Sequence, residues 1–185
     1  MKIKDLIKPM VAIGILAFLI CCLIKKPSTW DDYASYISYA VSAVTILYIL
    51  YERWLWIFIP WKRPPILKKH YDGTIYYYEG NESKTKSIDV FVEQRLFSLK
   101  ITTKTDINSS YTIAASIEQE YENFFLYYTY ITNPNASVQA GNPIQHGTCR
   151  IVLSPDTRSL RGKYWTTSNT IGDIILQEHT EQNGE

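Results

Sequence analysis

The residues of this chain that could carry chemistry are hydroxyl and aromatic side chains at the ends of predicted strands. The sequence holds fifteen tyrosines in 185 residues. Tyrosine offers a stacking face and a polar tip, which together suit a nucleobase, whereas threonine and tyrosine are also favoured in strands for packing alone. Composition leaves both interpretations open. The candidate ligand-binding residues, one arginine among them, are Tyr77, Tyr78, Thr103, Thr105, Ser109, Ser110, Arg150, Tyr164 and Thr166.

Arg150 is the candidate that would meet a phosphate, because a guanidinium group forms paired hydrogen bonds to phosphate oxygens. In its predicted strand it shares one face with Thr148 and Val152. The opposite face carries Cys149 and Ile151. Arg150 reaches a ligand only if the Thr148 face points into the domain; otherwise it is a solvated surface residue. Both faces carry an apolar residue, so alternation does not choose between them.

The chain shows no pattern typical of an enzyme. It has no HExxH motif, no glycine-rich phosphate loop, no GxSxG motif and no paired-cysteine metal spacing. His70, His146 and His179 are isolated in the sequence, and none has a visible partner for general-base chemistry. We therefore expect a binding protein with no cofactor and no metal. The net charge of +1 does not predict a nucleic-acid-binding protein.

The elements that must position these residues are β-strands separated by turn signals. The predicted strands cover residues 72–79, 87–94, 96–103, 109–117, 124–132, 147–153, 159–167 and 171–177. Eight strands with short connections most simply close into an antiparallel up-and-down β-barrel, which leaves no exposed edge. Such a barrel is just wide enough to be filled by side chains or to hold one small ligand.

Two apolar spans, residues 9–24 and 33–59, precede the predicted barrel. Long apolar helices are costly in water and stable in lipid. A cleaved signal peptide is the rival interpretation of the first span, but its end is a poor cleavage site and a second span follows at once. The predicted fold class is therefore mainly β with N-terminal membrane helices. The predicted order is a transmembrane hairpin (1–61), a basic proline-rich linker (62–69), a cytosolic ligand-sensing barrel (70–178) and a polar tail (179–185).

Basic residues gather before the first span and after the second one, while the intervening loop carries Lys25 and Lys26 beside two aspartates. The positive-inside rule then places both termini in the cytoplasm. Cysteine use agrees with this orientation. Cys149 is the one cysteine of the predicted β region, so no disulfide can form within it, which suits a reducing compartment.

After the two spans, several short motifs follow one another in a fixed order. They are Tyr71-x-Gly73, the threonine-rich segment 103–110, Leu126-Tyr-Tyr-Thr-Tyr130 running into Asn133-Pro134, His146-Gly-Thr148, Leu160-Arg-Gly-Lys-Tyr164 and Gly172-x-Ile174. In this order they resemble the two-transmembrane β-barrel effectors of bacterial CBASS antiphage systems, over nearly the whole chain. Tyr71 departs from the family pattern, which begins the barrel with Trp-x-Gly.

The resemblance implies that the barrel binds a cyclic dinucleotide made by a partner CD-NTase-type nucleotidyltransferase. It further implies that binding controls self-association of the hairpins, which disrupt the bacterial inner membrane and kill the infected cell. The related Panoptes arrangement uses similar effectors in the opposite sense, with the nucleotide holding the effector inactive. Two other classes stay open: a lipocalin-like, membrane-anchored binder of an apolar small molecule, and a structural scaffold whose barrel is filled.

Overall fold

The computed structural model describes residues 4–58, 64–79, 82–136 and 143–180. The chain divides into two compact units, a helical one (residues 1–63 with 95–97) and a β unit (residues 64–94 with 98–185). Each unit is described by itself. The predicted hairpin end at residue 61, the predicted linker start at residue 62 and tail residues 181–185 lie outside the described residues.

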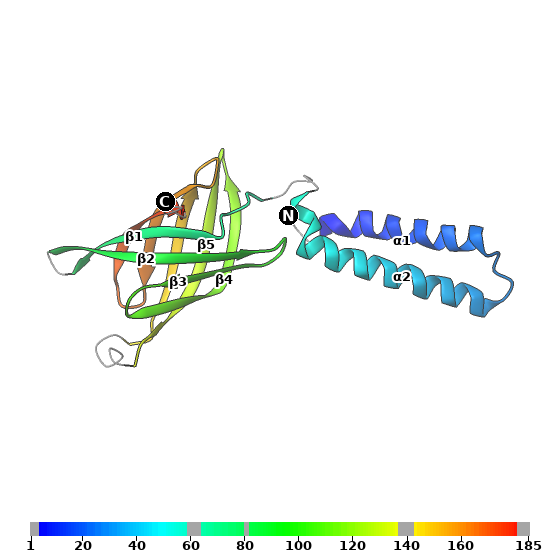
Figure 1. Ribbon diagram of the computed structural model, residues 1–185, viewed down its shortest axis with the longest axis horizontal. Helices are drawn as coiled ribbons and strands as arrows, with labels where there is room; N and C mark the ends of the chain where they lie inside the picture. The colour runs from blue at the N-terminus through cyan, green and yellow to red at the C-terminus, as the bar shows by residue number, and fades with distance from the viewer. Residues whose placement is uncertain (1–3, 59–63, 80–81, 137–142, 181–185) are drawn as a thin grey trace, which may run out of the picture. The chain divides into compact units, whose positions relative to one another are not determined.

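The helical unit contains α1 (Lys4–Ile24), α2 (Trp30–Arg53) and the short 3-10 helix η1 (Leu55–Ile57). α1 and α2 run side by side in opposite directions (Figure 1). Both are long and apolar enough to cross a membrane, by length and composition. The predicted second span reached residue 59, whereas α2 ends at Arg53, because Trp54 leaves the helical conformation with a φ of −136° and a 3-10 turn follows.

Local sequence explains how the two helices begin and pack. Thr29 starts α2 with a capping box, in which its hydroxyl accepts from the Asp32 N–H and the Asp32 carboxylate accepts from the Thr29 N–H. A side chain at Gly14 of α1 would lie 3.4 Å from Val44 of α2. Glycine at this position therefore lets the two helices approach each other closely.

The β unit is a closed barrel in which each strand pairs antiparallel with its sequence neighbours and β1 pairs with β8. The strands are β1 (His70–Glu79), β2 (Glu82–Gln94), β3 (Leu99–Lys104), β4 (Asn108–Glu120), β5 (Asn123–Pro134), β6 (His146–Leu153), β7 (Ser159–Thr166) and β8 (Ile171–Glu178). Two apolar helices followed by an eight-stranded up-and-down barrel confirm the predicted fold class.

Two strand starts differ by three or more positions from the prediction. β2 begins at Glu82, five positions before the predicted start at residue 87, because its polar first half continues the hairpin with β1 as far as the Glu79–Glu82 pair. β3 begins at Leu99 and not at residue 96, because residues 96–98 continue the apolar alternation without pairing to another strand. The paired start of β2 was missed because it is polar. The unpaired segment before β3 was predicted as strand because its apolar residues alternate.

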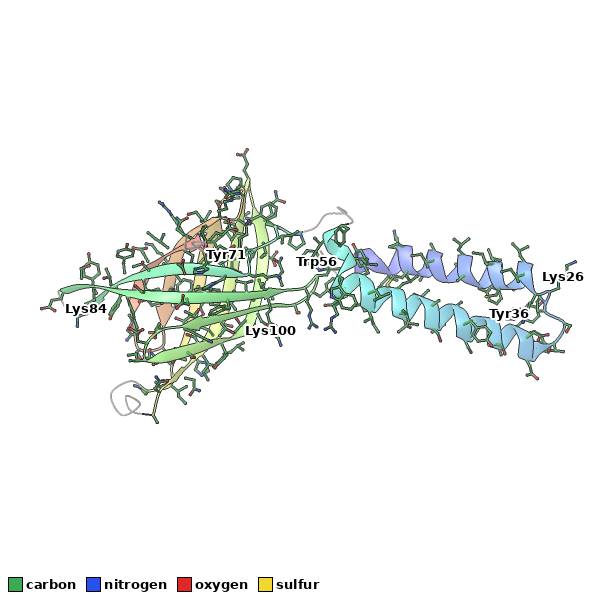
Figure 2. The ribbon with its side chains drawn as sticks, in the orientation of Figure 1. Lys26, Tyr36, Trp56, Tyr71, Lys84 and Lys100 are labelled. Atoms are coloured by element: carbon green, nitrogen blue, oxygen red, sulfur yellow. The ribbon has the colours of Figure 1, made fainter. Side chains whose placement is uncertain are left out.

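Apolar side chains fill one half of the barrel. The inward-facing residues of this half include Tyr71, Val90, Val92, Leu126, Ile151, Leu153, Leu160 and Leu176. Tyr71, labelled in Figure 2, is fully buried. Its hydroxyl donates to the Thr157 carbonyl and accepts from the Lys68 N–H, both at 2.8 Å. Burial raises the Tyr71 pKa to about 12, so this hydroxyl stays a neutral anchor inside the filled half.

Candidate ligand-binding site

The other half of the barrel encloses a cavity of about 440 Å³ to which all eight strands contribute. The cavity begins at the level along the strands where tyrosine and hydroxyl side chains take the inward positions that aliphatic side chains hold in the filled half. The residues that line it are Ile75, Tyr77, Tyr78, Lys86, Ile88, Thr103, Thr105, Ile107, Asn108, Ser110, Tyr128, Tyr130, Thr132, Gln145, Cys149, Tyr164, Thr166, Thr170 and Ile174. The barrel is therefore filled at one end and hollow at the other.

The structure brings most of the predicted ligand-binding residues together around this cavity. Those that line it are Tyr77, Tyr78, Thr103, Thr105, Ser110, Tyr164 and Thr166. Ser109 does not line it, because successive strand residues point to opposite faces and its neighbours Asn108 and Ser110 take the inward positions. The binding roles themselves stay predictions.

Arg150 lies on the outer face of the barrel, which corrects the hypothesis that it clamps a phosphate inside. Cys149 and Ile151 on either side of it are buried, and Arg150 is exposed. Its Nη2 donates to Glu120 Oε2 at 2.9 Å, and its Nε donates to the Tyr127 hydroxyl at 2.7 Å. The guanidinium carbon lies 4.0 Å from the ring centroid of Phe125. Arg150 is thus a surface residue with its own partners.

Lys86 lines the cavity and was not among the predicted ligand-binding residues. Among the described residues that line the cavity, Lys86 alone carries a positive charge. Burial lowers its pKa, and the Asp106 carboxylate partly opposes this shift. The available signal was alternation, because Lys86 stands two residues before Ile88 and so shares the strand face on which Ile88 is buried. The predicted strand began one residue too late to include it.

The aromatic lining also includes two tyrosines that were not predicted, Tyr128 and Tyr130 on β5. Their ring centroids are 5.7 Å apart, with the planes tilted by 41°. The ring of Tyr130 lies over Gly147, and the ring of Tyr164 lies over Gly172. These glycines leave room for the rings against the barrel wall, so large flat surfaces are presented without closing the cavity.

The tyrosine and cysteine side chains that the wall buries are neutral at ordinary pH. Burial raises the pKa of Tyr164 and of the Cys149 thiol to about 12, and it also raises the pKa values of Tyr128 and Tyr130. The described lining residues include no histidine, aspartate or glutamate. They offer rings, hydroxyls, amides and one ammonium group, which suit binding, and no ordinary general acid or base for catalysis.

Two of the threonine hydroxyls that line the cavity already form hydrogen bonds with backbone atoms at its rim. The Thr105 hydroxyl donates to the Asn108 carbonyl and accepts from the Asn108 N–H. The Thr132 hydroxyl makes the same reciprocal pair with the backbone of Gln145. Thr105, one of the predicted ligand-binding residues, therefore also fixes the turn that shapes the mouth of the cavity.

The comparisons with known proteins bear on this barrel directly. Residues 63–178 match the family model described as "Cap15, cyclic dinucleotide receptor domain". The chain is also 34% identical over 183 residues to the CD-NTase-associated protein 15 of Staphylococcus schleiferi, covering 96% of this chain and 97% of that protein. This chain belongs to the Cap15 family. The membership confirms the resemblance to CBASS effectors that the ordered motifs indicated.

Among solved structures, a redesigned β-barrel covers 62% of this chain and 92% of its own, with a TM-score of 0.46 and 12% identity. A likeness of that size carries no information about function. The Cap15 model spans all eight strands, and with them every residue that lines the cavity. The family model therefore covers the whole barrel that holds the candidate site.

Proposed function

We propose that this chain is a membrane-anchored CBASS effector whose barrel binds a cyclic dinucleotide in the tyrosine-lined cavity. The observation that carries the proposal is a cavity with aromatic walls and a single lysine, in a chain of the Cap15 family. Its volume of about 440 Å³ falls within the range of roughly 300–1,000 Å³ that is usual for small-molecule sites. The protein acts as a receptor and not as an enzyme.

The proposed chemistry assigns one group to each part of the ligand. The rings of Tyr128, Tyr130 and Tyr164 supply faces on which bases stack. Lys86 supplies the charge that meets one phosphate, in a setting where desolvation strengthens the attraction. Since a cyclic dinucleotide has two phosphates, the second one lies toward the mouth of the cavity, where hydroxyl groups and water meet it.

The two alternative classes receive less support from this site. A structural scaffold would have a filled barrel, whereas this barrel is hollow over half its interior. A lipocalin-like binder of an apolar molecule would have a largely apolar lining. The Lys86 ammonium group would then lose water without gaining a partner from the ligand, which costs free energy.

For the helical unit we propose a membrane hairpin that acts through self-association in the bacterial inner membrane, with both termini in the cytoplasm. Two helices enclose no pore, so disruption of a bilayer requires many copies. An apolar groove between α1 and α2, lined in part by Val11, Ile15 and Val41, presents the close-packing surface that such assembly needs. The partner nucleotidyltransferase supplies the ligand, which either triggers assembly or prevents it.

The deciding experiment is calorimetry of the full-length protein in detergent against a panel of cyclic dinucleotides. We expect one ligand to bind and Lys86→Ala to weaken it by about 1.5–3 kcal/mol, which is about ten- to a hundredfold in Kd. Lys163→Ala is the matched control, because Lys163 is exposed and does not line the cavity. Binding that is equal in both variants, or absent for every cyclic dinucleotide, contradicts the proposal.

The sense of the switch follows from a second measurement on the same protein. Leakage of dye from liposomes and oligomer size are recorded with and without the bound nucleotide. A ligand shifts such an equilibrium only through its differential affinity for the two states. A rise of both quantities on binding indicates an activating ligand, and a fall of both indicates a ligand that holds the effector inactive. Oligomer size that ignores every bound nucleotide contradicts control of assembly by the barrel.

A further inference from the structure

A second cluster of ligand-capable side chains lies outside the cavity, on the outer wall of the barrel where β1, β2 and the end of β8 meet. His70 and Asp72 flank the buried Tyr71 and therefore point outward. Asp89 of β2 stands opposite Asp72 in the strand register. His179 follows β8 directly, and its N–H donates to the His70 carbonyl at 3.1 Å. Because the barrel closes between β1 and β8, residues of the first strand and the residue after the last strand lie in one cluster.

The donor atoms of this cluster face one another. His179 Nδ1 lies 2.9 and 2.8 Å from the two carboxylate oxygens of Asp72. His70 Nε2 lies 3.5 Å from Asp89 Oδ1 and 4.0 Å from Asp72 Oδ1. His70, Asp72 and His179 can each offer one ligand atom, with these atoms all within 4.8 Å of one another. Ligand atoms about 2.0–2.2 Å from a tetrahedral ion lie about 3.3–3.5 Å apart, a value that the observed separations bracket.

His70 Nε2 gives independent support for a bound cation. This ring nitrogen is shielded from water and has no hydrogen-bond partner among the described residues, although it faces two carboxylates. A polar atom shielded in this way costs free energy unless a partner satisfies it. The ring of Phe91 stacks on His70 with centroids 4.4 Å apart, so the imidazole is held in this orientation. A cation would satisfy the nitrogen where it already points.

We propose that His70, His179, Asp72 and Asp89 form a binding site for a divalent transition-metal ion of the zinc class. Two imidazole nitrogens and two carboxylate oxygens are a borderline donor set that suits zinc better than calcium or magnesium. The ion would also relieve the repulsion between two aspartates that lie directly opposite on neighbouring strands. No metal was expected from the sequence, in which His70 and His179 are isolated from each other.

The site would tie the first strand of the barrel to the residue that follows the last one. An ion that binds the folded chain and not the unfolded chain raises the free energy of unfolding. Lys104 limits the affinity. It stands opposite Asp89 in the register, and its ammonium group lies 5.2 Å from the Phe91 centroid, so it competes for the Asp89 carboxylate. This proposal is independent of the nucleotide site, because none of its four residues lines the main cavity.

The test uses the untagged full-length protein in detergent after treatment with a chelator. Zinc is titrated by calorimetry, and cobalt is used as a spectroscopic substitute whose visible absorption reports tetrahedral coordination. We expect one ion per chain and a higher melting temperature with zinc. His179→Ala and Asp72→Asn should each weaken binding on the order of tenfold or more and reduce the thermal shift. His146→Ala is the control, because His146 is exposed and lies outside the cluster.

Three outcomes would overturn the proposal. They are no zinc binding, binding that the cluster variants leave unchanged, and binding that the His146 variant removes equally. A cluster held only by hydrogen bonds between its histidines and aspartates would give the first outcome, together with a loss of stability in His179→Ala without any metal. Circular dichroism of each variant establishes that the barrel is folded, so a lost site is distinguished from a lost fold.

Discussion

The ring of Tyr130 on β5 lies directly over Gly147 on β6, in the space that a side chain at position 147 would need. We expect Gly147→Ala to push this ring into the cavity and to weaken cyclic-dinucleotide binding by about 1–3 kcal/mol, the usual cost of overpacking. Calorimetry measures the change. Tyr130→Phe keeps the ring and removes only the hydroxyl, so it is the control expected to bind more tightly than Gly147→Ala. Wild-type affinity in Gly147→Ala would show that the ring position does not matter.

The affinity for the nucleotide should fall at high pH through Lys86. Burial lowers the pKa of this lysine, so it loses its charge below the pH at which an exposed lysine does. Affinity is therefore full below the lowered pKa and decreases as the pH rises through it. Titrations from neutral pH to about pH 10 would show the decrease. Lys86→Arg should remove it, because arginine stays charged throughout this range. An identical pH profile in both proteins would assign the effect to another group.

In the ligand-free protein, the contribution of Lys86 to the free energy of unfolding should increase with pH, whereas its contribution to nucleotide affinity decreases. A lowered pKa means that the unfolded chain holds this proton more tightly than the folded chain. The contribution of Lys86 to the free energy of unfolding therefore rises as the pH passes from its lowered pKa to that of an exposed lysine. Denaturant unfolding of wild type and of Lys86→Met is measured across this pH range. The difference between their free energies of unfolding gives the contribution of Lys86. A greater rise in the methionine variant would contradict this sign.

Arg150→Ala should leave nucleotide affinity unchanged, because Arg150 points away from the cavity. The variant loses the bonds to Glu120 and Tyr127, both of which are surface contacts, so only a small loss of stability is expected. Hydrogen bonds from Tyr127 and Arg150 lower the pKa of Glu120. This stabilisation is present above the Glu120 pKa of the unfolded chain and is lost as the pH falls through the folded value. Weakened binding in Arg150→Ala would contradict the outward placement.

Two leucine substitutions should separate packing within a hairpin from packing between hairpins. Gly14 faces Val44 of the same chain, so Gly14→Leu should separate α1 from α2 and lower the free energy of unfolding of the hairpin. Ala43 is exposed along α2, so Ala43→Leu should leave one hairpin intact and disturb contacts between copies. Crosslinking in liposomes and dye leakage measure assembly. Both variants should keep wild-type nucleotide affinity, and full leakage from Ala43→Leu would exclude this face from the assembly contact.

The sequence by itself determined the elements of this protein. Strict alternation along segments such as Ile88–Val92 predicts strands, because a strand half-buried in a barrel must alternate. Short connections then predict antiparallel neighbours, and eight of them predict closure. The apolar spans predicted the two helices on composition alone. Most of the predicted hydroxyl and tyrosine residues reached the cavity, because strand ends on the inner face converge at one mouth of a barrel.

Only the tertiary structure decided which face points inward and which distant residues meet. Alternation shows that Arg150 and Thr148 share a face, but Val152 and Ile151 put an apolar residue on each face, so orientation required the closed barrel. Lys86 stood in a polar segment, and its inclusion in β2 depended on how far the pairing with β1 extends. His70 and His179 meet because β1 pairs with β8. Register between the first and last strands is a non-local property, set by packing of the whole barrel and not by any segment alone.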